Sequence, residues 1–172
     1  RFCHYSGVKV YVTLNTLVFD REIPLLAKAI ENCAKADVDA FIVQDMGVAR
    51  LARQIVPELP LHASTQMTVN SPEGAIMAKE LGFTRVVLGR ELSLAQIKAI
   101  TESCDIETEL FVHGALCVCI SGQCYMSSVL GGRSGNRGLC AQPCRLDFTS
   151  GDRHNILSLK DLSLTEKLPE LA

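Results

Sequence analysis

The chain has 172 residues, of which 48% are hydrophobic and 21% are charged, and its formal net charge is −2. This length is sufficient for one domain with a hydrophobic core, and the near-neutral charge excludes a uniformly basic nucleic-acid binder. The sequence contains no apolar run of about 18 residues, so no membrane-spanning helix is expected.

The first two thirds of the chain alternate between strand-like and helix-like segments. The β-branched run that starts at Val8 predicts a strand, and the spacing of Ile23, Leu26 and Ile30 predicts a helix. Ser71 and Ser93 are suitable N-caps for two later helices. The predicted strands cover residues 8–14, 40–43, 61–62, 85–88 and 107–112, and the predicted helices cover 21–36 and 47–56 and follow Ser71 and Ser93.

Repeated strand–helix units with short connections indicate an α/β fold with a parallel sheet. None of the strands is followed by a GxGxxG motif. We therefore predict a partial TIM-like (β/α) barrel, with an open doubly wound sheet as the alternative. Because a complete barrel needs about 250 residues, we expect flanking segments of the same polypeptide to supply the missing units.

The domain organisation changes after Val112. Residues 1–112 are predicted to form the barrel units. Residues 113–155 are rich in Gly, Ser, Cys and Arg and are predicted to form a long loop that binds a metal cluster and an anion. Residues 156–172 are predicted to supply a return strand over 156–159 and a helix of the barrel.

Polar residues are found at the predicted strand ends, which lie together at one end of a barrel. They indicate a binding site, although a hydrogen-bonded network without a ligand remains the alternative. The candidate acid/base residues are His62, Glu91 and His113, and Glu91 could instead pair with Arg90. The candidate substrate-binding residues at these ends are Asn15, Gln44 and Gln66.

Four cysteines in the long loop are candidate metal ligands. Cys117, Cys124, Cys140 and Cys144 lie within 28 residues that contain no Asp or Glu, and Cys119 is a fifth cysteine nearby. Structural zinc sites normally have two closely spaced pairs, and only Cys140 and Cys144 are spaced in that way. The wide spacing favours an iron–sulfur cluster, with zinc and a purely structural cluster as alternatives. The number of cysteines in a chain of this length suits a reducing cytoplasm better than a disulfide scaffold.

The glycine-rich run at 131–138 contains Arg133 and Arg137. Exposed backbone amides and guanidinium groups of this kind could bind a phosphate or a carboxylate. The arginines could also pair with carboxylates elsewhere in the protein.

Several segments resemble the peptidase U32 family, historically called collagenase-like peptidases. They are VYVTLNTLVFD, VQDMGVARL, HASTQMTV, ELFVHGALC, GQCYMS and GGRSGNRGLCAQPCR. The resemblance covers practically the whole chain and implies a TIM-barrel-like domain. It also implies one of two functions. One is proteolysis, and the other is hydroxylation of tRNA uridine or rRNA cytidine by enzymes that require prephenate and hold a 4Fe–4S cluster. The family's cluster ligands map onto Cys117, Cys124, Cys140 and Cys144.

Chemistry favours the hydroxylase. Peptide hydrolysis needs an activated nucleophile or a metal-bound water, and the chain contains neither HExxH nor GxSxG. Clustered thiolates instead bind a redox centre, which suits hydroxylation of a ring carbon. We therefore expect a cytoplasmic RNA hydroxylase that uses prephenate as a co-substrate and has no membrane partner. A peptidase and a non-catalytic, metal-stabilised RNA- or protein-binding domain remain alternatives.

Overall fold

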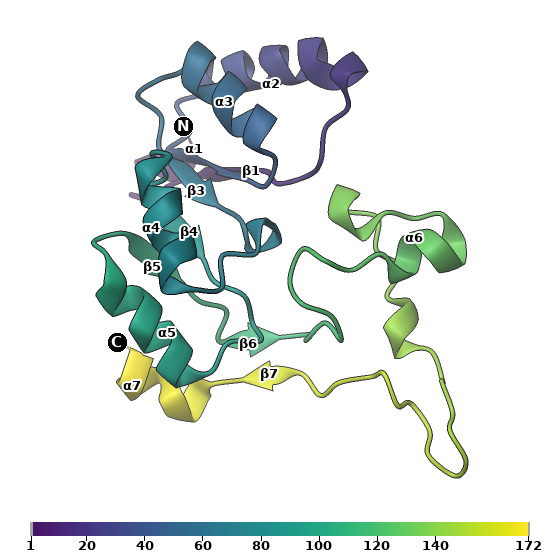
Figure 1. The fold of residues 1–172 in the computed structure, drawn as a ribbon. Helices are drawn as coiled ribbons and strands as arrows, with labels where there is room; N and C mark the ends of the chain where they lie inside the picture. Colours follow the sequence, from purple (N-terminus) through teal and green to yellow (C-terminus); the bar gives the residue numbers. More distant parts are fainter. Residues whose placement is uncertain (1, 172) are drawn as a thin grey trace.

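A computed structural model of the chain describes residues 2–171 and contains a five-stranded parallel sheet (Figure 1). Its strands are β1 (Tyr11–Leu14), β2 (Ala40–Val43), β3 (Leu61–Ala63), β4 (Arg85–Val87) and β5 (Glu107–Glu109). They lie in the order β1-β2-β3-β4-β5, so each strand pairs with its neighbour in sequence. In a doubly wound sheet the spatial order of the strands reverses at a switch point, whereas in a barrel each strand lies beside the next one in the sequence. The predicted α/β class is confirmed, and the strand order is that of a barrel segment.

Helices alternate with these strands, as predicted. They are α1 (Phe2–Tyr5), α2 (Ile23–Lys35), α3 (Met46–Ile55), α4 (Pro72–Glu80) and α5 (Leu94–Ser103). Both predicted N-caps are present, because Ser71 Oγ accepts a hydrogen bond from Gly74 N at 3.1 Å and Ser93 forms a capping box with Gln96. The helix boundaries therefore follow the local capping residues.

The two faces of the sheet differ in polarity because side chains alternate along a strand. One face packs on α2–α5 and forms the core, in which Phe41, Leu61 and Ile100 are fully or almost fully buried. The opposite face carries polar groups, including His62 and Arg85, which are register partners on β3 and β4. This polar face would line the inside of a closed barrel.

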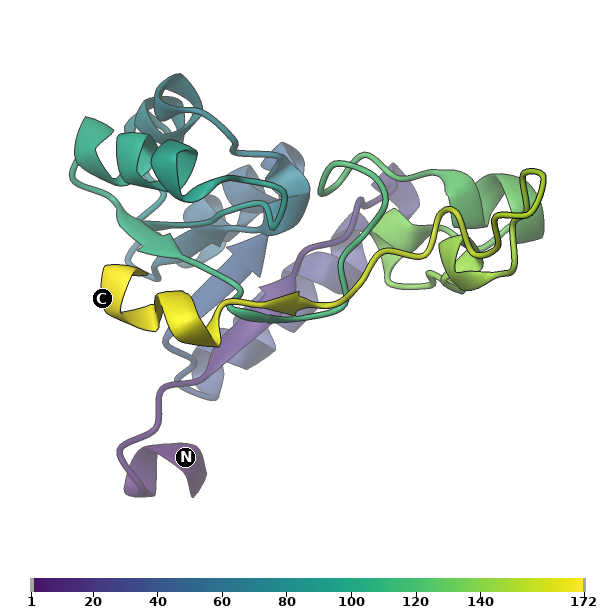
Figure 2. The ribbon, with the colours of Figure 1, turned by 90° about the horizontal axis from the view of Figure 1, so that it is seen from below.

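Residues 113–163, hereafter the Cys lobe, extend away from the sheet (Figures 1 and 2). The lobe starts with β6 (His113–Gly114), contains α6 (Met126–Gly131), and ends with β7 (Leu162–Ser163), which pairs antiparallel with β6. The prediction of a barrel return strand at 156–159 was therefore wrong. The chain returns three residues later, and its short strand joins β6 rather than the parallel sheet. This pairing is long-range, and no local periodicity in residues 113–163 indicates it.

The chain continues from the lobe into a short 3₁₀ turn, η5 (Thr165–Lys167), and α7 (Leu168–Leu171), beside α5 in Figure 1. A helix was predicted within residues 156–172, and the described helix there is Leu168–Leu171. None of the helices within residues 2–171 is long and apolar enough to cross a membrane.

Candidate functional site

A cavity of about 210 Å³ lies between the Cys lobe and the carboxyl ends of β3 and β4. Thr65 and Gln66 of the 3₁₀ turn η2 (Thr65–Met67) and Arg90 line it from the side of the sheet. The lobe contributes a mainly apolar wall that includes Val118, Ile120 and Met126. The cavity is therefore at the end of the sheet where parallel α/β folds bind their ligands.

All four predicted cysteine ligands, Cys117, Cys124, Cys140 and Cys144, line this cavity. Cys119 lines a separate cavity of about 90 Å³ with Glu91 and Leu159 instead. All of the chain's eight cysteines are free thiols in the described structure. Cys117 lines both cavities, whereas Cys119 does not line the one that the four predicted ligands share.

Two of these sulfur atoms accept hydrogen bonds. Cys117 Sγ accepts one from Arg90 Nη2, and Cys140 Sγ accepts one from the backbone N–H of Gln142, each at 3.3 Å. N–H donors around cysteine sulfur are typical of sites that hold negatively charged metal–thiolate groups.

The donor set of this cavity fits an iron–sulfur cluster or zinc, since four soft ligands line one space. The thiols are not yet in a closed coordination shell. Between residues 2 and 171, no three His, Cys, Asp or Glu side chains are grouped closely enough to hold a metal ion. The cavity therefore brings the four predicted ligands to one place without grouping them into a closed metal site.

Residues 121–123 attach the lobe to the sheet. Glu91 accepts hydrogen bonds from the backbone N–H and the hydroxyl of Ser121, both at 2.9 Å. Thr68 Oγ1 donates to Ser121 O and accepts from Gln123 Nε2, again at 2.9 Å in each case. Gly122 has a φ of +79°, and a Cβ at this position would lie 2.4 Å from Gln66 O. Only glycine fits this approach without displacing backbone.

A buried asparagine connects the two halves of the lobe. Asn136 is only 5% exposed, and its Nδ2 donates to Gly122 O at 2.7 Å. Ser127, which is also buried, accepts a hydrogen bond from Ala141 N at 3.0 Å. These bonds hold the segment that contains Cys140 and Cys144 next to the segment that contains Cys124.

Glu91 was predicted to be an acid/base group, but its contacts favour a positioning role. Burial raises the pKa of Glu91, and the hydrogen bonds from Ser121 and Asn70 more than offset this, so its net pKa is below the usual range. Glu91 is therefore ionised at neutral pH, and its carboxylate oxygens already accept hydrogen bonds from Ser121 and Asn70.

The two candidate histidines lie outside the cavity. His62 is 4% exposed, its ring packs edge-on against Tyr11 with centroids 4.9 Å apart, and its Nδ1 has no hydrogen-bond partner among the described residues. Burial, followed by the charge of Arg85, lowers the pKa of His62. His113 is exposed in β6. Neither histidine lines the cavity with the four cysteines.

Of the predicted substrate-binding residues at the strand ends, Gln66 alone lines the cavity. Its Nε2 donates to Asn15 O at 3.0 Å, so Asn15 contributes through its backbone. Gln44 is 9% exposed and its Oε1 is buried without a partner in the described structure. It lies two residues beyond Ile42, the register partner of His62, on the polar face of the sheet.

The prediction that Arg137 binds an anion is contradicted, because its guanidinium is already paired. Its Nη2 lies 2.6 Å from Glu22 Oε1, its Nη1 donates to Leu17 O at 2.7 Å, and it stacks over Phe19. The hydrogen bond from Arg137 is the main reason that the pKa of Glu22 falls to about 2. The alternative pairing with a carboxylate is therefore the correct one. Arg133, in contrast, is exposed and has no ion pair within residues 2–171.

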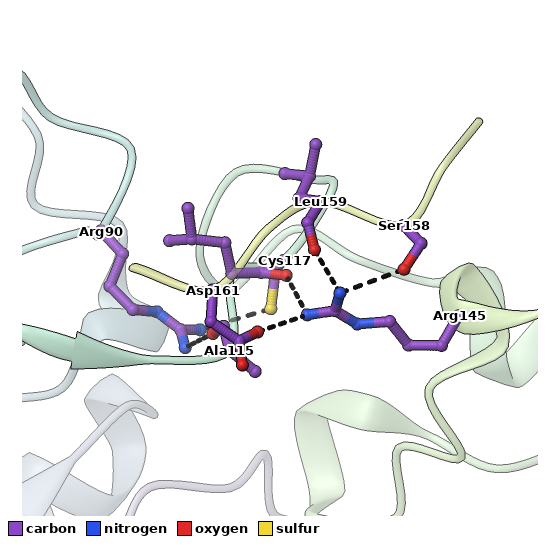
Figure 3. A network of polar contacts seen from close by, with 8 residues as sticks. Arg90, Ala115, Cys117, Arg145, Ser158, Leu159 and Asp161 are labelled. Carbon is purple, nitrogen blue, oxygen red and sulfur yellow. Dashed lines mark hydrogen bonds and ion pairs between the residues drawn. The ribbon is translucent and has the colours of Figure 1, made fainter. Parts of the chain in front are cut away.

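Two further arginines, Arg145 and Arg90, shape the site (Figure 3). Arg145 holds the returning segment, since it hydrogen-bonds Ser158 Oγ at 3.1 Å and pairs with Asp161 at 3.2 Å. It also donates to the carbonyl oxygens of Leu116 and Leu159. Arg90 donates to Ala115 O at 2.6 Å as well as to Cys117. The two arginines bind partners that lie 13 to 29 residues away in the sequence. The spacing of residues within a motif does not reveal such partners.

Comparison with known proteins gives several similar sequences. The chain is 44% identical, over 99% of its length and 27% of the relative, to the 23S rRNA 5-hydroxycytidine C2501 synthase of Escherichia coli. It is 39% identical to the uncharacterized protease MJ0090 of Methanocaldococcus jannaschii and 35% identical to tRNA hydroxylation protein P of Helicobacter pylori. Both matches cover 99% of this chain, with 46% and 44% of the respective relatives. The chain thus spans less than half the length of these relatives.

A solved structure, that of the U32 peptidase Mk0906, supports the fold. It superposes with a TM-score of 0.56 at 20% identity, over 66% of this chain and 49% of that one. The family model of peptidase family U32 matches residues 1–172. This match, with relatives of such similarity over the full chain, shows that the chain belongs to peptidase family U32.

Proposed function

We propose that the chain is the barrel portion of an RNA hydroxylase that depends on an iron–sulfur cluster. Its substrate would be a base of RNA, either a tRNA uridine or an rRNA cytidine, and prephenate would be the co-substrate. The observation that supports this best is the set of four motif cysteines around one cavity at the carboxyl end of the sheet. Two relatives are named for hydroxylation of rRNA and of tRNA, which supports the same proposal.

Each part of the cavity has a role in this proposal. Cys117, Cys124, Cys140 and Cys144 would hold the cluster, which when bound supplies one-electron redox chemistry. Thr65 and Gln66 offer polar groups to a substrate in the same space, and the apolar wall of Val118 and Ile120 would exclude water from it.

The lobe also offers a cation for RNA or for the carboxylates of the co-substrate. Arg133 is exposed near the end of α6, and its charge is uncompensated among the residues described. Such a guanidinium suits a phosphate or a carboxylate. The free thiols support a reducing location, and we propose that the protein is cytoplasmic.

The family name and the protease relative keep proteolysis as an alternative. A cysteine peptidase needs a thiolate beside a histidine. His113 is exposed in β6, whereas Cys119 lines the small cavity beside Glu91, and no hydrogen bond joins the two in the described structure. This geometry favours the hydroxylase.

The test uses full-length protein purified without oxygen. We expect iron and acid-labile sulfide in the wild type, and zinc alone would reject the cluster and leave a metal-stabilised binding domain. In a deletion strain, mass spectrometry of RNA nucleosides should show loss of one hydroxylated base. Wild-type protein should restore the base, the double variant Cys117→Ala/Cys124→Ala should not, and Cys104→Ser, remote from the cavity, should. Gelatin cleavage that survives the double variant would favour the peptidase.

A further inference from the structure

Arg90 lies at the edge of the cysteine cavity, where three contacts hold it, and Figure 3 shows the two that are hydrogen bonds. Its Nη1 donates to Ala115 O at 2.6 Å, its Nη2 donates to Cys117 Sγ at 3.3 Å, and its guanidinium lies over Phe111 at 5.6 Å from the ring centroid. A guanidinium fixed in this way presents one N–H to one sulfur atom in a defined direction.

The positive charge of Arg90 is not neutralised nearby. Arg137 and Arg145 each pair with a carboxylate of the chain, Glu22 and Asp161. Arg90 has no such ion pair in the part of the chain that the structure describes, and the adjacent Glu91 is directed to Ser121 instead. The Nε of Arg90 is buried without a hydrogen-bond partner in the same region. The edge of the cavity therefore carries a positive charge that no carboxylate of the described residues pairs with.

We propose that Arg90 is a positioning residue that raises the reduction potential of a cluster bound by Cys117 and its three companions. This inference rests on the proposed function. A cluster gains negative charge when it takes up an electron. A hydrogen bond to a ligand sulfur and a nearby positive charge both stabilise the reduced form, so they shift the potential upward.

The first experiment compares three full-length variants loaded with a cluster. Arg90→Gln removes the charge, and Arg90→Lys keeps the charge but loses the planar fork that reaches Ala115 O and Cys117 Sγ together. Arg133→Gln, which changes an arginine of the Cys lobe, is the control. By redox titration, we expect a shift to more negative potential in Arg90→Gln, a smaller shift of the same sign in Arg90→Lys, and none in Arg133→Gln. An Arg90→Gln potential equal to that of the wild type would overturn the inference.

A second measurement does not require an Arg90 variant to fold. Wild-type protein grown with arginine labelled with ¹⁵N in its guanidinium group would be reduced and studied by pulsed electron paramagnetic resonance. We expect a ¹⁵N hyperfine coupling to the cluster, and we expect Arg133→Gln to retain it. Its absence from the wild type would refute the contact and with it the inference. A wild type that binds no iron would overturn the proposed function as well, so the two failures are distinguishable.

Discussion

The carboxylate of Glu91 accepts two hydrogen bonds from Ser121, one from its backbone N–H and one from its hydroxyl, both at 2.9 Å. Glu91 follows β4, and Ser121 lies between Cys119 and Cys124. This pair therefore links the end of the parallel sheet directly to the segment that presents the cysteines.

Glu91→Gln should loosen this segment. An amide offers Ser121 one acceptor and places an N–H₂ group against its donors, which should cost about 1–3 kcal/mol of local stability. Hydrogen exchange at residues 119–124 should accelerate, while Glu58→Gln, a change at an exposed carboxylate, should leave it unchanged. Equal exchange rates in both variants would show that Ser121 does not depend on Glu91.

Gly122→Ala should destabilise the contact between the lobe and η2. The new Cβ would meet Gln66 O at 2.4 Å on a backbone with a φ of +79°. We expect a loss of about 1–3 kcal/mol in the free energy of unfolding, measured with urea. Gly131→Ala is the matched control, because a Cβ there meets nothing within 4 Å. If both variants unfold at the same urea concentration, the close approach at Gly122 is not formed.

The ion pair of Glu22 and Arg137 should make the attachment of the lobe sensitive to acid. The pKa of Glu22 is lowered from 4.5 to about 2, so its contribution is present above pH 4.5 and is lost as the pH falls towards 2. Urea unfolding at several pH values should show wild type more stable than Glu22→Gln at pH 6, with the difference shrinking below pH 4.5. Asp152→Asn, at an exposed site, should show no such pH-dependent difference. A difference that stays constant down to pH 2.5 would exclude the ion pair as its cause.

Single cysteine variants should define the ligand set. Replacement of Cys117, Cys124, Cys140 or Cys144 by Ser should each reduce the iron content of anaerobically purified protein, because each removes one thiolate from the same cavity. Cys119→Ser should keep the iron of the wild type, since Cys119 lines a different cavity. If Cys119→Ser loses iron and Cys144→Ser retains it, Cys119 rather than Cys144 is the fourth ligand.

Local signals in the sequence predicted the parallel sheet well. The strand at Ala40–Val43 was placed to the residue, and the caps at Ser71 and Ser93 were confirmed, because a strand run or a cap depends on neighbours in the chain. The grouping of the four cysteines at one cavity was also expected, although their role as ligands stays a prediction.

Long-range contacts could not be derived in this way. Arg137 and Glu22 are 115 residues apart, and glycine-rich surroundings alone suggested that this arginine was free for an anion. Arg90 and Cys117 are separated by 27 residues in different elements. Such partners are decided by how the lobe packs on the sheet, which composition and spacing do not encode.

The pairing of β6 with β7 brings the two ends of the Cys lobe together, and Leu164 N donates to Val112 O at 2.8 Å directly beside this pair. A segment whose entry and exit are adjacent can be exchanged without stretching the host fold. The lobe is therefore a natural unit for chimeras. Cuts after Val112 and before Leu164 would graft the cysteine-bearing cassette of one family member onto the scaffold of another, provided that the counterparts of Glu91 and Thr68 are transplanted with it.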